Sequence, residues 1–173
     1  MNAHLPHPKN FLDRLFALLP GLPTHYAHLQ LDHLCYRVET REDYAALRTV
    51  LFRENELLTE STIGGRPIAV FRLARPYIYG PRRIDLLELP APKPGRPYPA
   101  GWEHAEFVTD RPLPAFRQYL VEQLEVPAEA IDDSGIGKTS NPDLRLHLPE
   151  GLSVKFHEQP LDAVIAAELA ADN

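Results

Sequence analysis

Two histidines occupy matching places in two similar stretches of the chain. His33 lies in the stretch 31–38 and His104 in the stretch 101–108. In each, an acidic residue precedes the histidine, an apolar-rich run continues to a valine, and a helix-like segment follows. Imidazole is a common ligand of divalent metals. The pair therefore predicts two metal ligands that face each other across a cleft, one from the first strand of each of two related modules.

A buried carboxylate is the third predicted ligand. Alternate residues of a strand share a face, so Glu88 lies with Ile84 and Leu86 in the predicted strand 83–89. A carboxylate among aliphatic side chains is costly unless it is paired or bound to a metal. We expect Glu88 to be a metal ligand, or to leave the metal and act as a catalytic base.

The last strand of the second module supplies the fourth predicted ligand. Val154 and Phe156 must face the helix-packed core, so Ser153, Lys155 and His157 face the cleft. An ammonium group repels a metal, which makes His157 the ligand and leaves Lys155 to bind substrate or to reach solvent along its stem. The alternative is that His157 lies just beyond the strand end, in solvent.

The four predicted metal ligands are His33, Glu88, His104 and His157. Imidazole and carboxylate together suit one ion of Zn²⁺, Fe²⁺, Ni²⁺ or Mn²⁺. Glu106 shares the face of His104 and is a second candidate catalytic residue that could orient an imidazole. The alternative for Glu106 is a solvated strand glutamate.

Three cationic side chains are candidate substrate contacts: Arg37, Lys138 and Lys155. Lys138 belongs to the glycine-containing stretch 135–140, which superficially resembles a phosphate-binding loop. That motif needs glycine where this chain has Asp132, and Asn141-Pro142 breaks the helix that should follow. An ordinary loop is the preferred interpretation.

Hydrophobic periodicity and turn residues predict an α+β fold of two βαβββ modules, 31–92 and 101–158, within a single domain of 1–173. The first module has a strand 31–39, a helix capped by Thr40, a hairpin of 56–63 and 66–73 across Gly64-Gly65, a loop 77–83 and the strand 83–89.

A proline-rich linker, 93–100, precedes the second module. There, Thr109 or Asp110 caps a helix, 127–140 holds one short strand, and 143–148 pairs with 152–157. Helices at 10–20 and 160–171 flank the modules. The strands are expected to form a curved, partly closed mixed sheet around the cleft.

Composition limits the function classes. Of 173 residues, 44% are hydrophobic, and the net charge is −6, which argues against a general nucleic-acid binder. The chain has no run of 18 apolar residues that could span a membrane. Its single cysteine excludes an internal disulfide. We expect a cytoplasmic monomer or homodimer that binds a small molecule.

Five short stretches together resemble one family: 31–38, Gly65-Arg66-Pro67-Ile68, Leu87-Glu88-Leu89-Pro90, Gly101-Trp102-Glu103-His104 and Val154-Lys155-Phe156-His157. They look like the YecM family of the vicinal oxygen chelate superfamily, which includes glyoxalases, extradiol dioxygenases and bleomycin-resistance proteins. The resemblance implies the paired βαβββ fold and a divalent metal held by the first and last strands of each module. In the glyoxalase pattern the last ligand is often glutamate, where this chain has His157.

The function that this resemblance implies is a metal-dependent isomerase, lyase or dioxygenase whose substrate chelates the metal through two neighbouring oxygens. The alternative is a non-catalytic module that uses the same cleft to bind or sequester a small molecule.

Overall fold

The computed structural model describes residues 4–21, 23–96 and 98–171, which divide into two compact units. The first unit contains the chain up to Pro8 and His33–Glu103, and the second contains Lys9–Asp32 and the chain from His104 onward. Strands β1 (Gln30–Arg37) and β5 (Gly101–Val108) contribute residues to both units. Each unit is described by itself.

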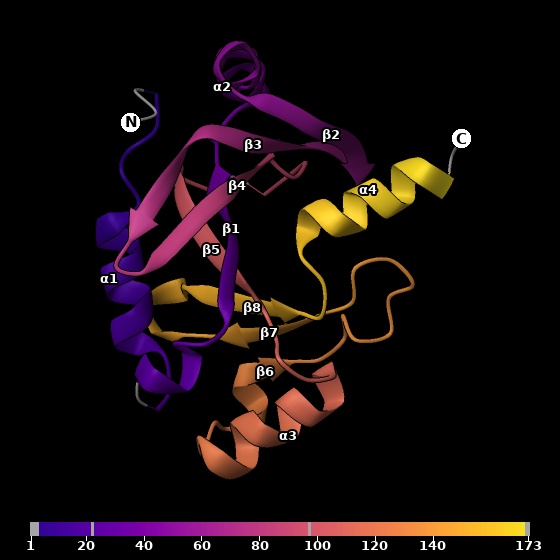
Figure 1. Ribbon diagram of the computed structural model, residues 1–173. Helices are drawn as coiled ribbons and strands as arrows, with labels where there is room; N and C mark the ends of the chain where they lie inside the picture. Colours follow the sequence, from indigo (N-terminus) through magenta and orange to yellow (C-terminus); the bar gives the residue numbers. More distant parts are fainter. Residues whose placement is uncertain (1–3, 22, 97, 172–173) are drawn as a thin grey trace. The chain divides into compact units, whose positions relative to one another are not determined.

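The first unit contains a four-stranded mixed sheet in the order β2-β3-β4-β1. β2 (Glu56–Ile63), β3 (Arg66–Tyr79) and β4 (Arg82–Pro90) pair antiparallel, and β4 pairs parallel with β1. Helix α2 (Arg41–Glu54) packs against β3 and β4 (Figure 1). Thr40 caps α2 as predicted, because its hydroxyl accepts the Asp43 amide at 3.0 Å in a capping box.

Two turns of the first unit test the predicted strand ends. Gly64 and Gly65 have φ of 59° and 77° and join Ile63 to Arg66, which confirms the tight glycine hairpin. The predicted loop at 77–83 was wrong. β3 continues to Tyr79 and β4 begins at Arg82, because a register shift between Arg72 and Tyr77 brings Tyr77 opposite Ile84. Both of those side chains are buried.

The second unit repeats this strand pattern in the order β5-β8-β7-β6. β5 pairs parallel with β8 (Ser153–His157), and β7 (Asp143–His147) pairs antiparallel with β8 and with β6 (Ile131–Asp132). Helix α3 (Leu113–Gln123) packs on β7 and lies beside β6 in Figure 1. Helices α1 (Lys9–Leu18) and α4 (Leu161–Ala171) correspond to the predicted flanking helices. Short 3-10 turns occur at Pro23–Tyr26, Ala128–Ala130 and Pro149–Gly151.

The predicted cap of α3 by Thr109 or Asp110 was wrong. The helix begins at Leu113, whose amide donates to the Glu158 carboxylate at 2.8 Å. Thr109 instead donates its hydroxyl to the Arg111 carbonyl at 2.6 Å, and Asp110 forms an ion pair with Arg111. A carboxylate distant in sequence therefore satisfies the helix start.

Aromatic side chains form the core on one face of the second sheet. Phe107 of β5 stacks on Phe156 of β8 with ring centroids 5.8 Å apart, and Phe116 of α3 lies 4.6 Å from Phe156. Tyr26 stacks on the same phenylalanine at 6.3 Å. Burial of these rings fixes the strand register, because a shift of one residue would expose them.

The predicted α+β fold of two βαβββ modules with added terminal helices is confirmed. In each unit the first and last strands pair in parallel and the inner strands are antiparallel. Pro97 of the predicted linker lies outside the described residues. The described part of 93–100 contains neither helix nor strand.

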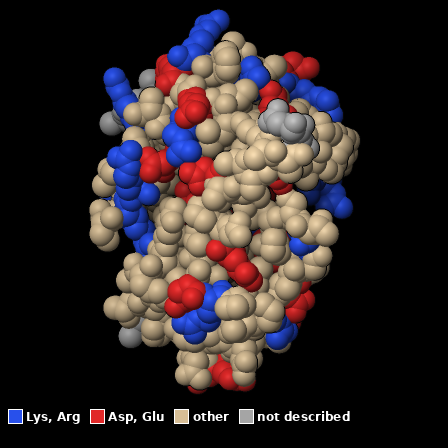
Figure 2. Space-filling model, turned by 45° about the vertical axis from the view of Figure 1, so that its right-hand side comes forward, with Lys and Arg blue, Asp and Glu red and all other residues tan. Residues whose placement is uncertain are grey.

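Two surface properties bear on partners. Among the described residues, no helix is long and apolar enough to cross a lipid bilayer. On the face shown in Figure 2, lysine and arginine side chains are interspersed with aspartate and glutamate side chains. This face therefore carries no broad basic surface of the kind that nucleic acids require.

Candidate metal centre

A row of polar side chains lines the face of the second sheet opposite Phe107 and Phe156. In the β5–β8 pairing, His104 is opposite Ser153, Glu106 opposite Lys155, and Val108 opposite His157. Residues directly opposite in a sheet share a face. The structure therefore brings the predicted residues His104, Glu106, Lys155 and His157 to one face of one sheet, in the predicted register.

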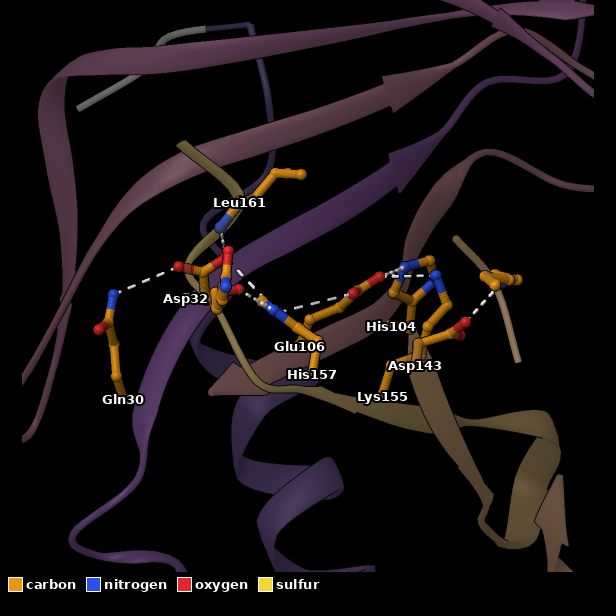
Figure 3. Close-up of polar contacts among 10 residues, drawn as sticks. Gln30, Asp32, His104, Glu106, Asp143, Lys155, His157 and Leu161 are labelled. Carbon is orange, nitrogen blue, oxygen red and sulfur yellow. Dashed lines mark hydrogen bonds and ion pairs between the residues drawn. The ribbon is translucent and has the colours of Figure 1, made fainter. Parts of the chain in front are cut away.

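Glu106 is the centre of this row (Figure 3). Its Oε1 lies 2.8 Å from His104 Nε2 and accepts a hydrogen bond from Lys155 Nζ at 2.6 Å. Its Oε2 lies 3.9 Å from His157 Nε2. Glu106 and His104 are each 3% exposed and His157 is 0% exposed, so the alternative of a solvated glutamate or histidine does not hold. Buried ionisable groups of this kind need compensating partners.

Hydrogen bonds fix the ring orientation of both histidines. His157 Nδ1 contacts the Gln159 carbonyl oxygen, which can only accept, so Nδ1 carries the proton. His104 uses Nε2 toward the Glu106 carboxylate. Metal-binding histidines typically donate one ring N–H to a carboxylate or carbonyl, which orients the other nitrogen toward the metal. This pattern makes His157 Nε2 and His104 Nδ1 the candidate ligand atoms.

Asp32 belongs to the same cluster and was not identified from the sequence. It is 3% exposed, and its Oδ2 lies 3.6 Å from His157 Nε2. The Leu161 amide donates to this oxygen at 3.1 Å, and the Gln30 side-chain amide donates to Oδ1 at 3.2 Å. The available signal was a carboxylate inside an apolar strand, but strand alternation assigned it to the face opposite His33.

The predicted residues of the first unit lie on β1 and β4. His33 is opposite Leu86 in the β1–β4 pairing, and Glu88 is opposite Cys35, so all four share a face. His33 is 1% exposed, whereas Glu88 is half-buried. The roles of His33 and Glu88 as metal ligands stay predictions.

Arg37 lies farther along β1 in the first unit. Its guanidinium carbon is 4.7 Å from the Tyr98 ring centroid, and its Nη1 is 3.8 Å from Glu103 Oε1. Cys35 Sγ is 3.6 Å from the other oxygen of Glu103. Arg37 is thus held by an aromatic ring and a carboxylate, and its role in binding substrate stays a prediction.

Lys138 donates a hydrogen bond to the Asp143 carboxylate, and its side chain is largely exposed. A Cβ at Gly135 would collide with that same carboxylate. The glycine in this loop therefore permits close packing against Asp143, which agrees with the interpretation as an ordinary loop. Contact of Lys138 with substrate stays a prediction.

The donor set of the second unit fits a divalent metal in chemical type. Ligand atoms of Asp32 and His157, and those of His104 and Glu106, lie within 4.8 Å of each other. Two imidazoles and two carboxylates are the ligands that Zn²⁺, Fe²⁺ and Mn²⁺ use in proteins. Lys155 is already bound at Oε1 of Glu106, so a metal next to His157 would use Oε2.

The paired βαβββ fold is shared with solved structures that are only 12% identical in sequence, so they show the fold alone. The chain belongs to the family described as YecM protein, whose model matches residues 2–168. The resemblance seen in the sequence motifs is thereby confirmed.

Two curated relatives match the sequence. Protein YecM of Escherichia coli (strain K12) is 28% identical over 171 residues, which covers 93% of this chain and 90% of that protein. An "Uncharacterized protein" of Haemophilus influenzae is 32% identical over 83 residues, covering 47% of this chain and 43% of that protein.

Solved structures match the fold. Protein EC4020, from structural genomics, has a TM-score of 0.67 and 27% identity, covering 92% of this chain and 84% of that chain. A methylmalonyl-CoA epimerase in complex with methylmalonyl-CoA and NH4+ has a TM-score of 0.51 and 12% identity, covering 75% and 93%. At this identity the epimerase shows the fold alone.

Proposed function

We propose that the chain is a divalent-metal-dependent enzyme that acts on a small molecule carrying two neighbouring oxygen atoms. The observation that carries the proposal is the buried cluster of the second unit, where His104 and His157 are each oriented by a protein acceptor. Burial of so many ionisable groups on one sheet face is typical of functional sites. The proposal covers an isomerase, a lyase or a dioxygenase.

In this proposal, His104 Nδ1 and His157 Nε2 are the metal-binding atoms of the second unit. The roles of His33 and Glu88 stay predictions from the sequence pattern. When bound, a divalent ion would supply Lewis-acid chemistry, binding two substrate oxygens and stabilising an oxyanion. Glu106 keeps the His104 ring in place through its contact at 2.8 Å. The same carboxylate is the candidate to move a proton of the substrate.

Lys155 adds a fixed positive charge to the site. Its ammonium lies 2.6 Å from Glu106, and its side chain is 16% exposed. Glu106 compensates this charge in the free protein. A divalent ion bound to Glu106 would leave the ammonium to attract an anionic substrate, such as a carboxylate, so we propose a substrate of that kind. The methylmalonyl-CoA epimerase that shares the fold was solved in complex with methylmalonyl-CoA.

Metal analysis of the purified protein tests the proposal. Chelator-treated protein would be titrated with Zn²⁺, Mn²⁺, Ni²⁺ and, without oxygen, Fe²⁺, and bound metal counted by elemental analysis. We expect one ion per chain, and we expect His104→Ala and His157→Ala to abolish tight binding, because few ligands then remain. His28→Ala is the matched control, since His28 is a half-exposed histidine of the same unit that pairs with Asp110. Retention of stoichiometric metal by both site variants would refute the assignment.

A second candidate is a non-catalytic module that binds a small anion. The ion pair between Lys155 and Glu106 favours it, because the ammonium compensates the buried carboxylate without a metal. The same titration separates the candidates. Failure of every tested metal to bind stoichiometrically would support the binding module.

A further inference from the structure

Asp32 is a buried carboxylate that two hydrogen-bond donors hold in place. It accepts hydrogen bonds from the Leu161 amide and from the Gln30 side chain. Leu161 is the first residue of the 11-residue helix α4, and the positive end of a helix stabilises a nearby anion. These two donors fix the position of the carboxylate, with its Oδ2 3.6 Å from His157 Nε2.

Three donor atoms gather at His157 (Figure 3). His157 Nε2 lies 3.6 Å from Asp32 Oδ2 and 3.9 Å from Glu106 Oε2. Both separations exceed the range of a hydrogen bond, roughly 2.7–3.2 Å. They approach the spacing of two ligands of one tetrahedral metal, about 3.4 Å for metal–ligand distances near 2.1 Å. The three atoms come from β1, β5 and β8, and all three side chains are buried.

We propose that Asp32 is a metal ligand and shares the ion with His157 Nε2. The inference rests on the proposed function and adds a residue that the sequence pattern did not include. The ligand atoms of Asp32 and His157 lie within 4.8 Å of each other, as two ligands of one ion must. Glu106 Oε2 lies 3.9 Å from the same His157 nitrogen, while its Oε1 is engaged by Lys155 and His104.

The assignment connects the metal to helix α4. Oδ2 of Asp32 is also the oxygen that accepts the Leu161 amide. Gln159, which orients the His157 ring, lies in the turn between β8 and α4. A bound ion would hold Asp32 and His157, and these are the two side chains whose hydrogen bonds fix the start of this helix. Metal binding should therefore slow the opening of the first turn of α4.

Metal affinity of Asp32→Asn tests the inference. Asparagine has the size of aspartate and keeps an oxygen to accept the Leu161 amide, but it lacks the charge that a ligand needs. We expect the Zn²⁺ and Co²⁺ affinities, measured by calorimetry, to fall on the order of 100-fold or more. The absorption spectrum of bound Co²⁺ should change, because one ligand is lost. Zn²⁺ should slow hydrogen exchange at the first turn of α4 in the wild type and not in the variant.

Asp143→Asn is the matched control. Asp143 is also buried in the second unit and pairs with His157 in the β7–β8 register, but its carboxylate bonds to Lys138. We expect this variant to bind Zn²⁺ within a few-fold of the wild type. Glu88→Gln, measured in parallel, reports separately on the carboxylate predicted from the sequence.

The outcomes separate the inference from the proposed function. If the wild type binds no metal, the proposed function fails and the inference fails with it. If the wild type and Asp32→Asn bind Zn²⁺ equally and give one Co²⁺ spectrum, the inference fails while the function stands. A lower melting temperature with unchanged affinity would show that Asp32 only anchors α4.

Discussion

The two units share one strand order but differ in how their ionisable side chains are placed on the sheet. In the first unit, Glu60 of β2 bonds to Tyr44 and Arg48 of α2 at 2.6–3.0 Å, between helix and strand. The face that carries His33 has the buried side chains of Ile84, Leu86 and Val70, and it also carries the half-buried Glu88. In the second unit, the corresponding face carries the buried cluster around Glu106.

This difference shows that strand topology does not determine the chemistry of the sheet face. The side chains at alternate positions of β5 and β8 determine that chemistry, because those positions point away from the aromatic core. A helix–strand ion pair near the surface contributes modestly to stability, whereas a buried set of charges is costly unless every member has a partner. The second unit therefore depends on mutual compensation, and the first does not.

The largest expected effect is the loss of the Glu106 charge. Glu106→Gln leaves the Lys155 ammonium buried without its anionic partner, which should lower the free energy of unfolding by about 3 kcal/mol. Glu88→Gln in the first unit should cost less than about 1 kcal/mol, because Glu88 is half-buried. Urea unfolding with chelator at pH 7 measures both. Equal losses of unfolding free energy in the two variants would show that the two units do not differ in this respect.

Removal of the ammonium is the reverse experiment. Lys155→Met leaves the Glu106 carboxylate buried, and we expect a loss of about 2 kcal/mol in chelator. A divalent metal should restore more stability to this variant than to the wild type, because the ion no longer competes with an ammonium for Glu106. Melting temperatures with and without Zn²⁺ provide the measurement. Identical Zn²⁺ stabilisation of the two proteins would contradict the shared use of Glu106.

Tyr77 should show the opposite sign in the first unit. Its hydroxyl is buried and, within the described residues, makes no hydrogen bond, and burial raises the pKa of Tyr77 to about 12. Tyr77→Phe removes this unsatisfied group and should raise the free energy of unfolding by up to about 1 kcal/mol. Chemical denaturation of both proteins at pH 7 measures this change in the free energy of unfolding. A loss of more than about 1 kcal/mol would mean that the hydroxyl has a partner in solution.

A modest, pH-dependent effect is expected for Glu60. Burial alone would raise the pKa of Glu60, but hydrogen bonds from Tyr44 and Arg48 hold it below the ordinary value of 4.5. The carboxylate therefore contributes stability above pH 4.5, and this contribution is lost as pH falls through the lower pKa of the folded state. Glu60→Gln should cost about 1 kcal/mol at pH 7 and progressively less below pH 4.5. A cost that does not depend on pH would argue against the ionic contact.

Much of the fold was predictable because local signals agreed with burial. The glycine pair 64–65, the Thr40 cap and the alternation around Phe156 each specify one conformation. The face shared by His104, Glu106, Lys155 and His157 followed from that alternation. What local signals could not give was the start of α3, because Glu158 is 45 residues away from Leu113.

Asp32 was missed for a related reason. Alternation along one strand tells which face a residue occupies only while that strand lies against a single layer. Near the start of β1, Asp32 instead meets the N-terminus of α4, which is 129 residues away in the sequence. Such a contact has no local signature. The continuation of β3 through Tyr77 was hidden similarly, because a register shift depends on the partner strand.

The outer strands of the two sheets have consequences for behaviour at high concentration. β2 ends the order of the first sheet, and β6 ends that of the second. An exposed edge strand can pair with another chain and start aggregation. β2 is rich in threonine, serine and glutamate and has a register irregularity between Leu57 and Thr59, and β6 is only two residues long. Both edges are poor templates for pairing, so mutations that make β2 apolar should promote precipitation before they alter the folded state.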